Sequence, residues 1–363
     1  MTMNVKTSAA RTSWTDDRRT LAAIWFLLAT AGFLALHRRL GIIDSDAEGY
    51  VVGARALREG KGYVDTFGHP LNHWPPGYSW LLSFFREPLP VALVLNAVSF
   101  GVAVAGLGLL ALEGGWTVST ASALASVIGF GLLRDLAVSA KPDILTYAAF
   151  FVAAVLYLRG GFLSRVAALV LWSVLIPVKM IAVVFAPGIL IGECITLGVG
   201  PFLRARHRES IAGAVAWFVA LGLLLRFNLA TIGRLAADSH EVATLSALRG
   251  EVVRFVVGTT RIGLINWYGS IRAPSIFVPC MAVLLLGVAA FASLRPGAQG
   301  RQLRWMGLST LGLAWLLEGV RTYYAGPRLM GYSMLLVVVG LPPIASRARL
   351  WHAYAVGSVF LAI

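Results

Sequence analysis

Residues 88–112 read PLPVALVLNAVSFGVAVAGLGLLAL, twenty-five residues without a charged side chain. A helix of about 20 mostly apolar residues crosses the hydrocarbon core of a bilayer, because its backbone amides are all satisfied within the helix. Comparable stretches recur along the chain, and we expect spans to begin at Leu21, Pro88, Thr117, Asp143, Ser164, Met180, Ser210, Ser275, Leu303 and Met330. The apolar run from His352 to Ile363 is too short to cross, so we expect the C-terminus to be incomplete. The pattern predicts one all-α membrane domain over 1–363 with about 10 to 11 transmembrane helices.

The composition agrees with a membrane protein. Hydrophobic residues make up 58% of the chain and charged residues 13%, against about a quarter charged in soluble domains. The net charge of +14 would suggest nucleic-acid binding in a soluble protein, but here the basic residues separate apolar runs and suit anchoring at a membrane surface. We therefore expect membrane lipids, and no nucleic acid, as partners. Cys194 and Cys280 lie in apolar segments, which excludes a disulfide framework.

The distribution of basic residues predicts the orientation. Lys6, Arg11, Arg18 and Arg19 precede the first apolar run, yet no small-residue cleavage site precedes His37. We expect an uncleaved first helix in the plasma membrane with its N-terminus in the cytoplasm. More than half of the basic residues then fall outside, and many of these lie in two long segments mixed with acids, whereas the positive-inside rule counts short loops. The short cytoplasmic turns carry Arg159, Arg165, Arg204, Arg206, Arg208, Arg295, Arg301, Arg304, Arg347 and Arg349.

Two long segments, 44–87 and 228–272, leave room for structure outside the membrane, and both fall on the predicted outer face. We expect the first to carry the catalytic residues and the second to be accessory, because function concentrates in such loops. From Ser45 onward, apolar residues at helical spacing predict an amphipathic helix on the membrane surface that Gly60 and Gly62 terminate. A similar stretch runs over 245–265.

An acidic cluster, Asp44-Ser45-Asp46-Ala47-Glu48, stands where the first span leaves the membrane. Carboxylates at this boundary can act as a general base or hold a cation. The same residues also suit a helix start, because Ser45 and Glu48 have the spacing of a capping box and acids in a first turn favour the helix dipole. The local pattern leaves both interpretations open.

The residues that follow carry a family resemblance: Asp46-Ala47-Glu48-Gly49-Tyr50, then Gly60-Lys61-Gly62-Tyr63, then Trp74-Pro75-Pro76-Gly77-Tyr78. This order resembles the first outer loop of GT-C glycosyltransferases, the multi-span class that includes protein O-mannosyltransferases and the lipid A aminoarabinose transferase. In that loop an acid four residues before a Tyr, a surface helix ending in a Gly-x-Gly-Tyr-like turn and a Pro-Pro segment recur. The resemblance covers 44–82, and the rest of the chain is similar in hydropathy alone.

The resemblance implies a polyprenyl-phosphate-linked sugar as donor, a lipid, glycan or protein as acceptor, and transfer on the outer face with inversion of the anomer. It implies that Asp46 is the catalytic base and that Asp44 forms a DxD-like pair with it. Asp44 and Asp46 are then the candidate ligands if a divalent cation takes part. Glu48, Tyr50 and Tyr63 are candidate substrate-binding residues of the same loop.

His73, with His69, is a candidate contact for an acceptor or a metal, although no third metal ligand stands at a recognisable spacing and a solvated loop histidine is the simpler interpretation. Asp143 in Ser139-Ala140-Lys141-Pro142-Asp143 matches an acid that many GT-C sequences carry in an outer loop, so it is a further catalytic candidate. Pro142 and Asp143 are also ordinary signals of a helix start.

Tyr323-Tyr324-Ala325-Gly326-Pro327-Arg328 resembles the element with which GT-C enzymes approach the lipid phosphate, although Leu329 stands where a Tyr is expected. Arg328 is thus a candidate phosphate ligand, with Lys141 and Arg321 in reserve. The alternative is an interfacial arginine that reaches to lipid head groups.

Two other functions remain open. A transporter or flippase of a lipid-linked or anionic substrate would also place charges in the membrane, but it predicts repeats, which we do not find. A non-catalytic GT-C homologue is the second alternative. Glu193 in the sixth predicted span is costly in lipid, so we expect it to face the bundle interior or an interface.

Overall fold

The computed structural model describes residues 6–36, 45–71, 74–232, 298–321 and 327–340, and within these ranges the regular structure is helical. The elements are α1 (Lys6–Leu36), α2 (Ser45–Arg58), α3 (Gly77–Ser83), α4 (Pro88–Glu113), α5 (Val118–Ile128), the π-helix η1 (Gly129–Leu133), α6 (Arg134–Ala137), α7 (Asp143–Arg159), α8 (Phe162–Val174), the 3₁₀-helix η2 (Met180–Val184), α9 (Phe185–Leu197), α10 (Val199–Ile232), α13 (Ala298–Arg321) and α14 (Pro327–Val339). Val64 and Pro70 form an isolated antiparallel bridge.

Four segments are long and apolar enough to cross a membrane: Asp17–Leu36, Pro88–Glu113, Met180–Leu197 and Val199–Thr231. The described residues are thus helical and include four candidate membrane spans, which favours the predicted helical membrane protein. The spans expected from Thr117 and Ser164 correspond to shorter apolar helices, Val118–Gly131 and Phe162–Val174. The span expected from Ser275 lies outside the described residues.

One predicted boundary is wrong. We expected a cytoplasmic turn at Arg204, Arg206 and Arg208 and a span from Ser210, but α10 begins at Val199 and continues through all four positions. Arginine is a good helix former, and Pro201 is tolerated because it stands in the first helical turn. Gly198, with a φ of +83°, separates α10 from α9 instead.

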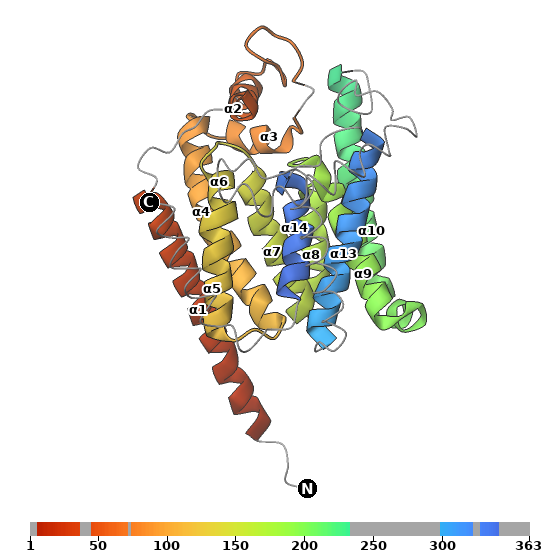
Figure 1. Ribbon diagram of the computed structural model, residues 1–363. Coiled ribbons are helices and arrows are strands. Elements are labelled where there is room, and N and C mark those ends of the chain that lie inside the picture. The colour runs from red at the N-terminus through yellow and green to blue at the C-terminus, as the bar shows by residue number, and fades with distance from the viewer. Residues whose placement is uncertain (1–5, 37–44, 72–73, 233–297, 322–326, 341–363) are drawn as a thin grey trace, which may run out of the picture.

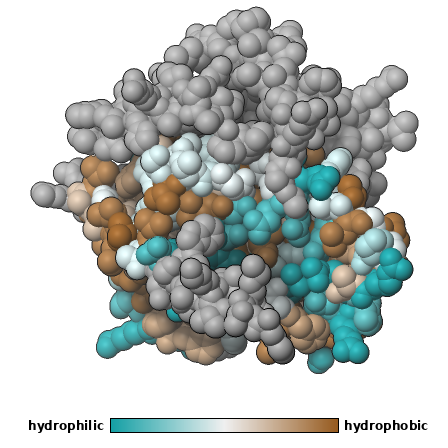
Figure 2. Space-filling view, turned by 90° about the horizontal axis from the view of Figure 1, so that it is seen from below, coloured by the Kyte–Doolittle hydropathy of each residue, from teal (hydrophilic) through white to brown (hydrophobic). Residues whose placement is uncertain are grey.

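The long helices run side by side in alternating directions, and α2 and α3 lie across one end of the bundle (Figure 1). We call this the α2 end, where α4, α7 and α14 begin, and the other the opposite end, where α1, α8, α10 and α13 begin. Figure 2 views the opposite end and shows hydrophilic residues gathered there between hydrophobic flanks. The start of α1 and the 45–87 loop thus lie at opposite ends, as the predicted topology requires.

Small residues let the helices approach closely, as is common between membrane helices. A Cβ on Gly192 of α9 would lie 2.4 Å from backbone atoms of Met306 in α13, and one on Gly106 of α4 would lie 2.8 Å from the Cβ of Phe151 in α7. These contacts fix α4 against α7 and α9 against α13, which form two of the main helix pairs of the bundle.

The predicted amphipathic helix is present as α2, and Gly60 and Gly62, with φ of +72° and +84°, follow its end. We expected its apolar face to lie on lipid, but this face packs against protein. Ala47, Tyr50 and Ala54 are buried with residues of α3 and α4 in a small core of their own. Because α2 packs on protein, it holds its acidic first turn in a defined place above the bundle. The second expected amphipathic stretch, 245–265, lies outside the described residues.

Candidate functional site

Asp46 and Lys141 meet at the α2 end. Oδ2 of Asp46 lies 3.6 Å from Nζ of Lys141, and its Oδ1 accepts a hydrogen bond of 3.3 Å from Nε1 of Trp74. The Asp46 side chain is 32% exposed and that of Lys141 14%. Three segments therefore supply this group: the first turn of α2, the loop before α3 and the turn before α7. Two predicted site residues thus lie in direct contact with each other.

Trp74 rests on the start of α2. A Cβ on Gly49 would lie 2.7 Å from the Trp74 ring, so the absence of a side chain at this position is what lets the indole approach. The ring also packs against Tyr50, with 6.3 Å between ring centroids. The backbone carbonyl of Trp74 accepts a hydrogen bond of 3.2 Å from the Tyr63 hydroxyl. These contacts aim the indole N–H at Asp46.

Tyr50 and Tyr63, both predicted substrate contacts, are buried. Tyr50 meets Tyr78 edge to face with centroids 5.4 Å apart, and its backbone oxygen accepts a hydrogen bond of 2.8 Å from Ser79. Tyr63 packs over Gly53, where a Cβ would lie 2.5 Å from its ring. Burial raises the pKa of the Tyr63 hydroxyl, which keeps it a hydrogen-bond donor. Tyr50 and Tyr63 therefore support Trp74, Tyr50 through its ring and Tyr63 through its hydroxyl.

The turn that carries Lys141 is held by an amide from inside the bundle. Asn96 in α4 donates to the backbone oxygens of Ser139 and Ala137 at 2.5 and 3.3 Å, and it accepts a hydrogen bond of 3.4 Å from Tyr78. The sequence analysis missed Asn96. Asn96 could have been found as the amide within the otherwise apolar run 88–112, because a buried amide requires hydrogen-bond partners.

Asp143 is 1% exposed and forms an ion pair with Lys179. Lys179 follows the turn after α8, where the carbonyl of Pro177 accepts a hydrogen bond of 2.7 Å from the backbone N–H of Gly77 at the start of α3. The pair therefore joins α7 to the turn on which α3 rests. The signal in the sequence that could have revealed this pair was a lysine within an apolar run.

The helix of Arg328 can be placed, although its side chain and that of Arg321 are outside what the structure describes. Tyr332 of α14 stacks on Tyr147 of α7 with centroids 3.8 Å apart. Arg328 is one helical turn before Tyr332, and Asp143 is one turn before Tyr147. Because α7 and α14 both begin at the α2 end, their first turns lie next to each other.

Of the remaining candidates, Glu48 and His69 do not join this group. Asp44 and His73 lie outside the described residues. Glu48 is exposed on α2. His69 lies in an exposed turn, where its Nδ1 is 3.3 Å from Oδ2 of Asp65.

Asp44, the other candidate ligand, lies outside the described residues, and the described residues around Asp46 do not make up a metal site. Both of its carboxylate oxygens have partners, and the Lys141 ammonium stands where a second cation would be repelled. Over the described ranges, no three His, Cys, Asp or Glu side chains are grouped to bind a metal together. We therefore assign no step to a metal.

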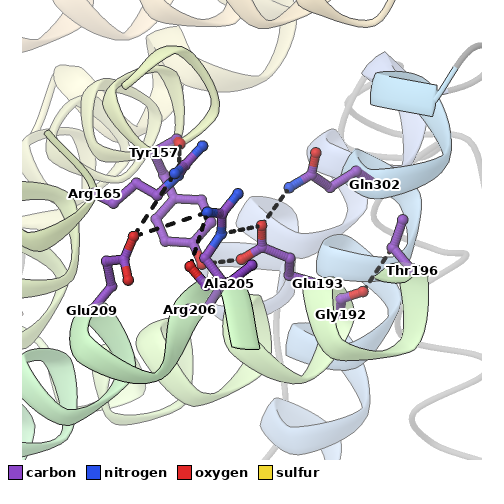
Figure 3. Close-up of polar contacts among 9 residues, drawn as sticks. All are labelled: Tyr157, Arg165, Gly192, Glu193, Thr196, Ala205, Arg206, Glu209 and Gln302. Carbon is purple, nitrogen blue, oxygen red and sulfur yellow. Dashed lines mark hydrogen bonds and ion pairs between the residues drawn. The ribbon is translucent and has the colours of Figure 1, made fainter. Parts of the chain in front are cut away.

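A second polar group lies at the opposite end, around Glu193 (Figure 3). Glu193 is 1% exposed and accepts hydrogen bonds from Tyr157, from Nε of Arg206 at 3.0 Å and from Gln302 at 3.3 Å. Arg206 and Arg165 also lie 3.9 and 3.8 Å from Glu209. The prediction that Glu193 faces the bundle interior is confirmed. This Glu193 cluster connects α7, α8, α9, α10 and α13.

Comparison of the chain with protein-family models, with curated proteins and with solved structures finds no match. The resemblance to GT-C enzymes therefore rests on the motif in 44–82, and the chemistry must be argued from the residues that the fold brings together. The structure itself shows a helical chain with four candidate membrane spans and, at one end of its bundle, a carboxylate and an ammonium group in contact.

Proposed function

We propose that this chain is a membrane glycosyltransferase of the GT-C type, with about ten spans, that takes a sugar from a polyprenyl-phosphate donor on the extracytoplasmic face. On this proposal the N-terminus is cytoplasmic and the α2 end faces outward. The observation that carries the proposal is the contact between Asp46 and Lys141, which joins a base to a phosphate-binding cation at one end of a membrane bundle.

Asp46 is suited to the role of general base. Its side chain is 32% exposed, so that an acceptor can reach it. The acceptor oxygen attacks the anomeric carbon and its proton passes to Asp46. The bond from that carbon to the phosphate oxygen breaks, its electron pair stays on the phosphate, and the anomer is inverted. Trp74 holds the carboxylate in place through its indole N–H.

Lys141 is suited to the leaving group. As the bond to carbon breaks, negative charge grows on the lipid phosphate, and a cation aimed at that charge lowers the barrier. An ammonium group binds phosphate as a point charge and can turn from Asp46 toward an arriving donor. Arg328 is the proposed second ligand, and the stacking of Tyr332 on Tyr147 supports it, because this contact sets the first turn of α14 beside that of α7.

Asp143 receives a positioning role in this proposal in place of the catalytic role that the resemblance implies. A carboxylate that is 1% exposed and paired with Lys179 is not available to an acceptor hydroxyl. Its pair instead holds the turn at Pro177, which binds the first residue of α3, and α3 in turn holds α2 through Ser79. Asp143 thus acts on Asp46 through this chain of contacts.

The proposal is tested with membranes that contain the wild-type protein and a panel of polyprenyl-phosphate donors carrying labelled sugars. We expect label to move to an endogenous acceptor with release of an equal amount of polyprenyl phosphate. Passage of an intact donor across the bilayer, with no cleavage of its sugar bond, would instead identify the flippase alternative.

A further inference from the structure

An apolar groove of about 250 Å³ lies between α1, α4 and α7. Its lining includes Phe26 of α1, Val102, Ala105 and Leu109 of α4, and Val152 and Leu156 of α7. Several of these side chains are half-buried, so the groove is open to the surroundings of the bundle. Because α1 and α4 carry candidate spans, the groove faces the hydrocarbon of a bilayer. An apolar groove in that place takes up a hydrocarbon chain, because the side chains that line an empty groove lose their van der Waals contacts.

Three charged side chains lie at one end of this groove. Arg18 is two helical turns from Phe26, Glu113 one turn from Leu109, and Arg159 one turn from Leu156. In each helix the step leads toward the opposite end of the bundle. The apolar groove therefore ends at a charged cluster at the level of the membrane surface.

Two arginines of this cluster bind one carboxylate. Arg18 and Arg159 both bind Oε1 of Glu113, Arg159 through its Nε at 2.7 Å, so two cations share one anion. Glu113 is buried, whereas the Arg159 side chain is 34% exposed. A guanidinium group has five N–H donors and binds phosphate oxygens in pairs. Arg159 can thus keep its bond to Glu113 and meet a phosphate from outside.

We propose that this groove and its Arg18–Glu113–Arg159 cluster bind one anionic glycerophospholipid of the leaflet at the opposite end. One acyl chain lies between α1, α4 and α7, and the headgroup phosphate contacts Arg159, with Arg18 behind it. The apolar lining selects a chain, and the exposed guanidinium group of Arg159 selects a lipid of net negative charge. The inference is independent of sugar transfer, because the charged cluster of the groove and Asp46 lie at different ends of the bundle.

The experiment is native mass spectrometry of the purified full chain in detergent with equal amounts of phosphatidylglycerol and phosphatidylcholine. We expect the wild type to retain one phosphatidylglycerol in preference to phosphatidylcholine. Arg159→Gln removes the exposed guanidinium group and should lower that preference about tenfold. Arg204→Gln, at an exposed arginine of α10, is the matched control and should leave it unchanged. Equal retention of both lipids by the wild type would overturn the proposal.

A second pair of variants tests the groove itself. Val152→Phe fills the groove and should reduce retention of both lipids, whereas Val170→Phe, at an exposed position of α8, makes the same change away from it. An unchanged bound lipid in a folded Val152→Phe protein would contradict the proposed position of the acyl chain. An equal loss in Arg204→Gln and Arg159→Gln would show a general attraction to basic residues and overturn the specific site.

Discussion

The Lys141 ammonium lies 3.6 Å from the carboxylate of Asp46, so the turn before α7 and the first turn of α2 share one ion pair. Neither element could hold this geometry alone. Asn96 holds the turn from within α4, and the Tyr50–Ser79 contact holds α2 on α3. The pair is partly exposed, where an ion pair contributes little to stability. Buried neighbours nevertheless hold the two residues in this geometry, which favours a role of the pair in binding or catalysis.

Lys141→Gln should impair use of the donor. The variant loses the cation that meets the leaving phosphate, so we expect kcat/KM for a polyprenyl-phosphate sugar to fall about ten- to hundredfold. Lys141→Arg keeps the charge and should recover part of the activity. Lys61→Gln, at an exposed lysine that pairs with Glu59, is the control. Equal rates for the wild type and Lys141→Gln would remove Lys141 from the mechanism.

Trp74→Phe should lower transfer more modestly, by about three- to tenfold, because it removes the hydrogen bond to Asp46 while an aromatic ring remains. Gly49→Ala should act on the same contact from the other side, since its Cβ would press on the Trp74 ring. Gly222→Ala in α10, which has open space around it, is the matched control. If both Trp74→Phe and Gly49→Ala transferred sugar at the wild-type rate, the indole would not position the base.

Local patterns predicted part of this architecture well. The helical spacing of Tyr50 and Ala54 and the stop at Gly60 and Gly62 are properties of neighbouring residues, and α2 follows them. The local pattern did not predict what covers the apolar face of α2. A lipid surface and the side chains of α3 and α4 are equally apolar, so the sequence pattern does not distinguish between them.

Glu193→Ala should destabilise the protein strongly. The substitution leaves Arg206 and Tyr157 without their buried partner, and breaking a buried ion pair costs about 3 to 5 kcal/mol. Thermal unfolding in detergent measures the loss, and Arg208→Ala, at an exposed arginine of the same helix, should have little effect. Similar stabilities for the two variants would show that the Glu193 cluster does not hold the opposite end together.

The pairings inside the bundle were beyond sequence reasoning. Asp143 and Lys179 stand at the ends of different helices, and nothing in either local pattern specifies the other as its partner. The same holds for Glu193 with Arg206 and Gln302. The cost of a lone charge in an apolar span predicts that a partner exists, while only the packing of the helices decides which residue it is.

Tyr63 should make stability fall at high pH. Burial raises its pKa, so the folded chain keeps the proton after the unfolded chain has lost it near pH 10. The contribution of Tyr63 is therefore complete below that pH and declines as the pH rises further. Unfolding by denaturant at several alkaline pH values should show a shallower decline for Tyr63→Phe than for the wild type. Parallel declines would contradict the burial of this hydroxyl.

The most direct measurement is sugar transfer by Asp46→Asn in membranes at matched expression, beside Glu59→Gln in the exposed turn that follows α2. The asparagine keeps the shape and the contact with Trp74 but cannot take a proton, so the proposal predicts a loss of at least about 100-fold with unchanged membrane insertion. Glu59→Gln should transfer at the wild-type rate. Transfer by Asp46→Asn at the rate of Glu59→Gln would contradict the assignment of Asp46 as the base.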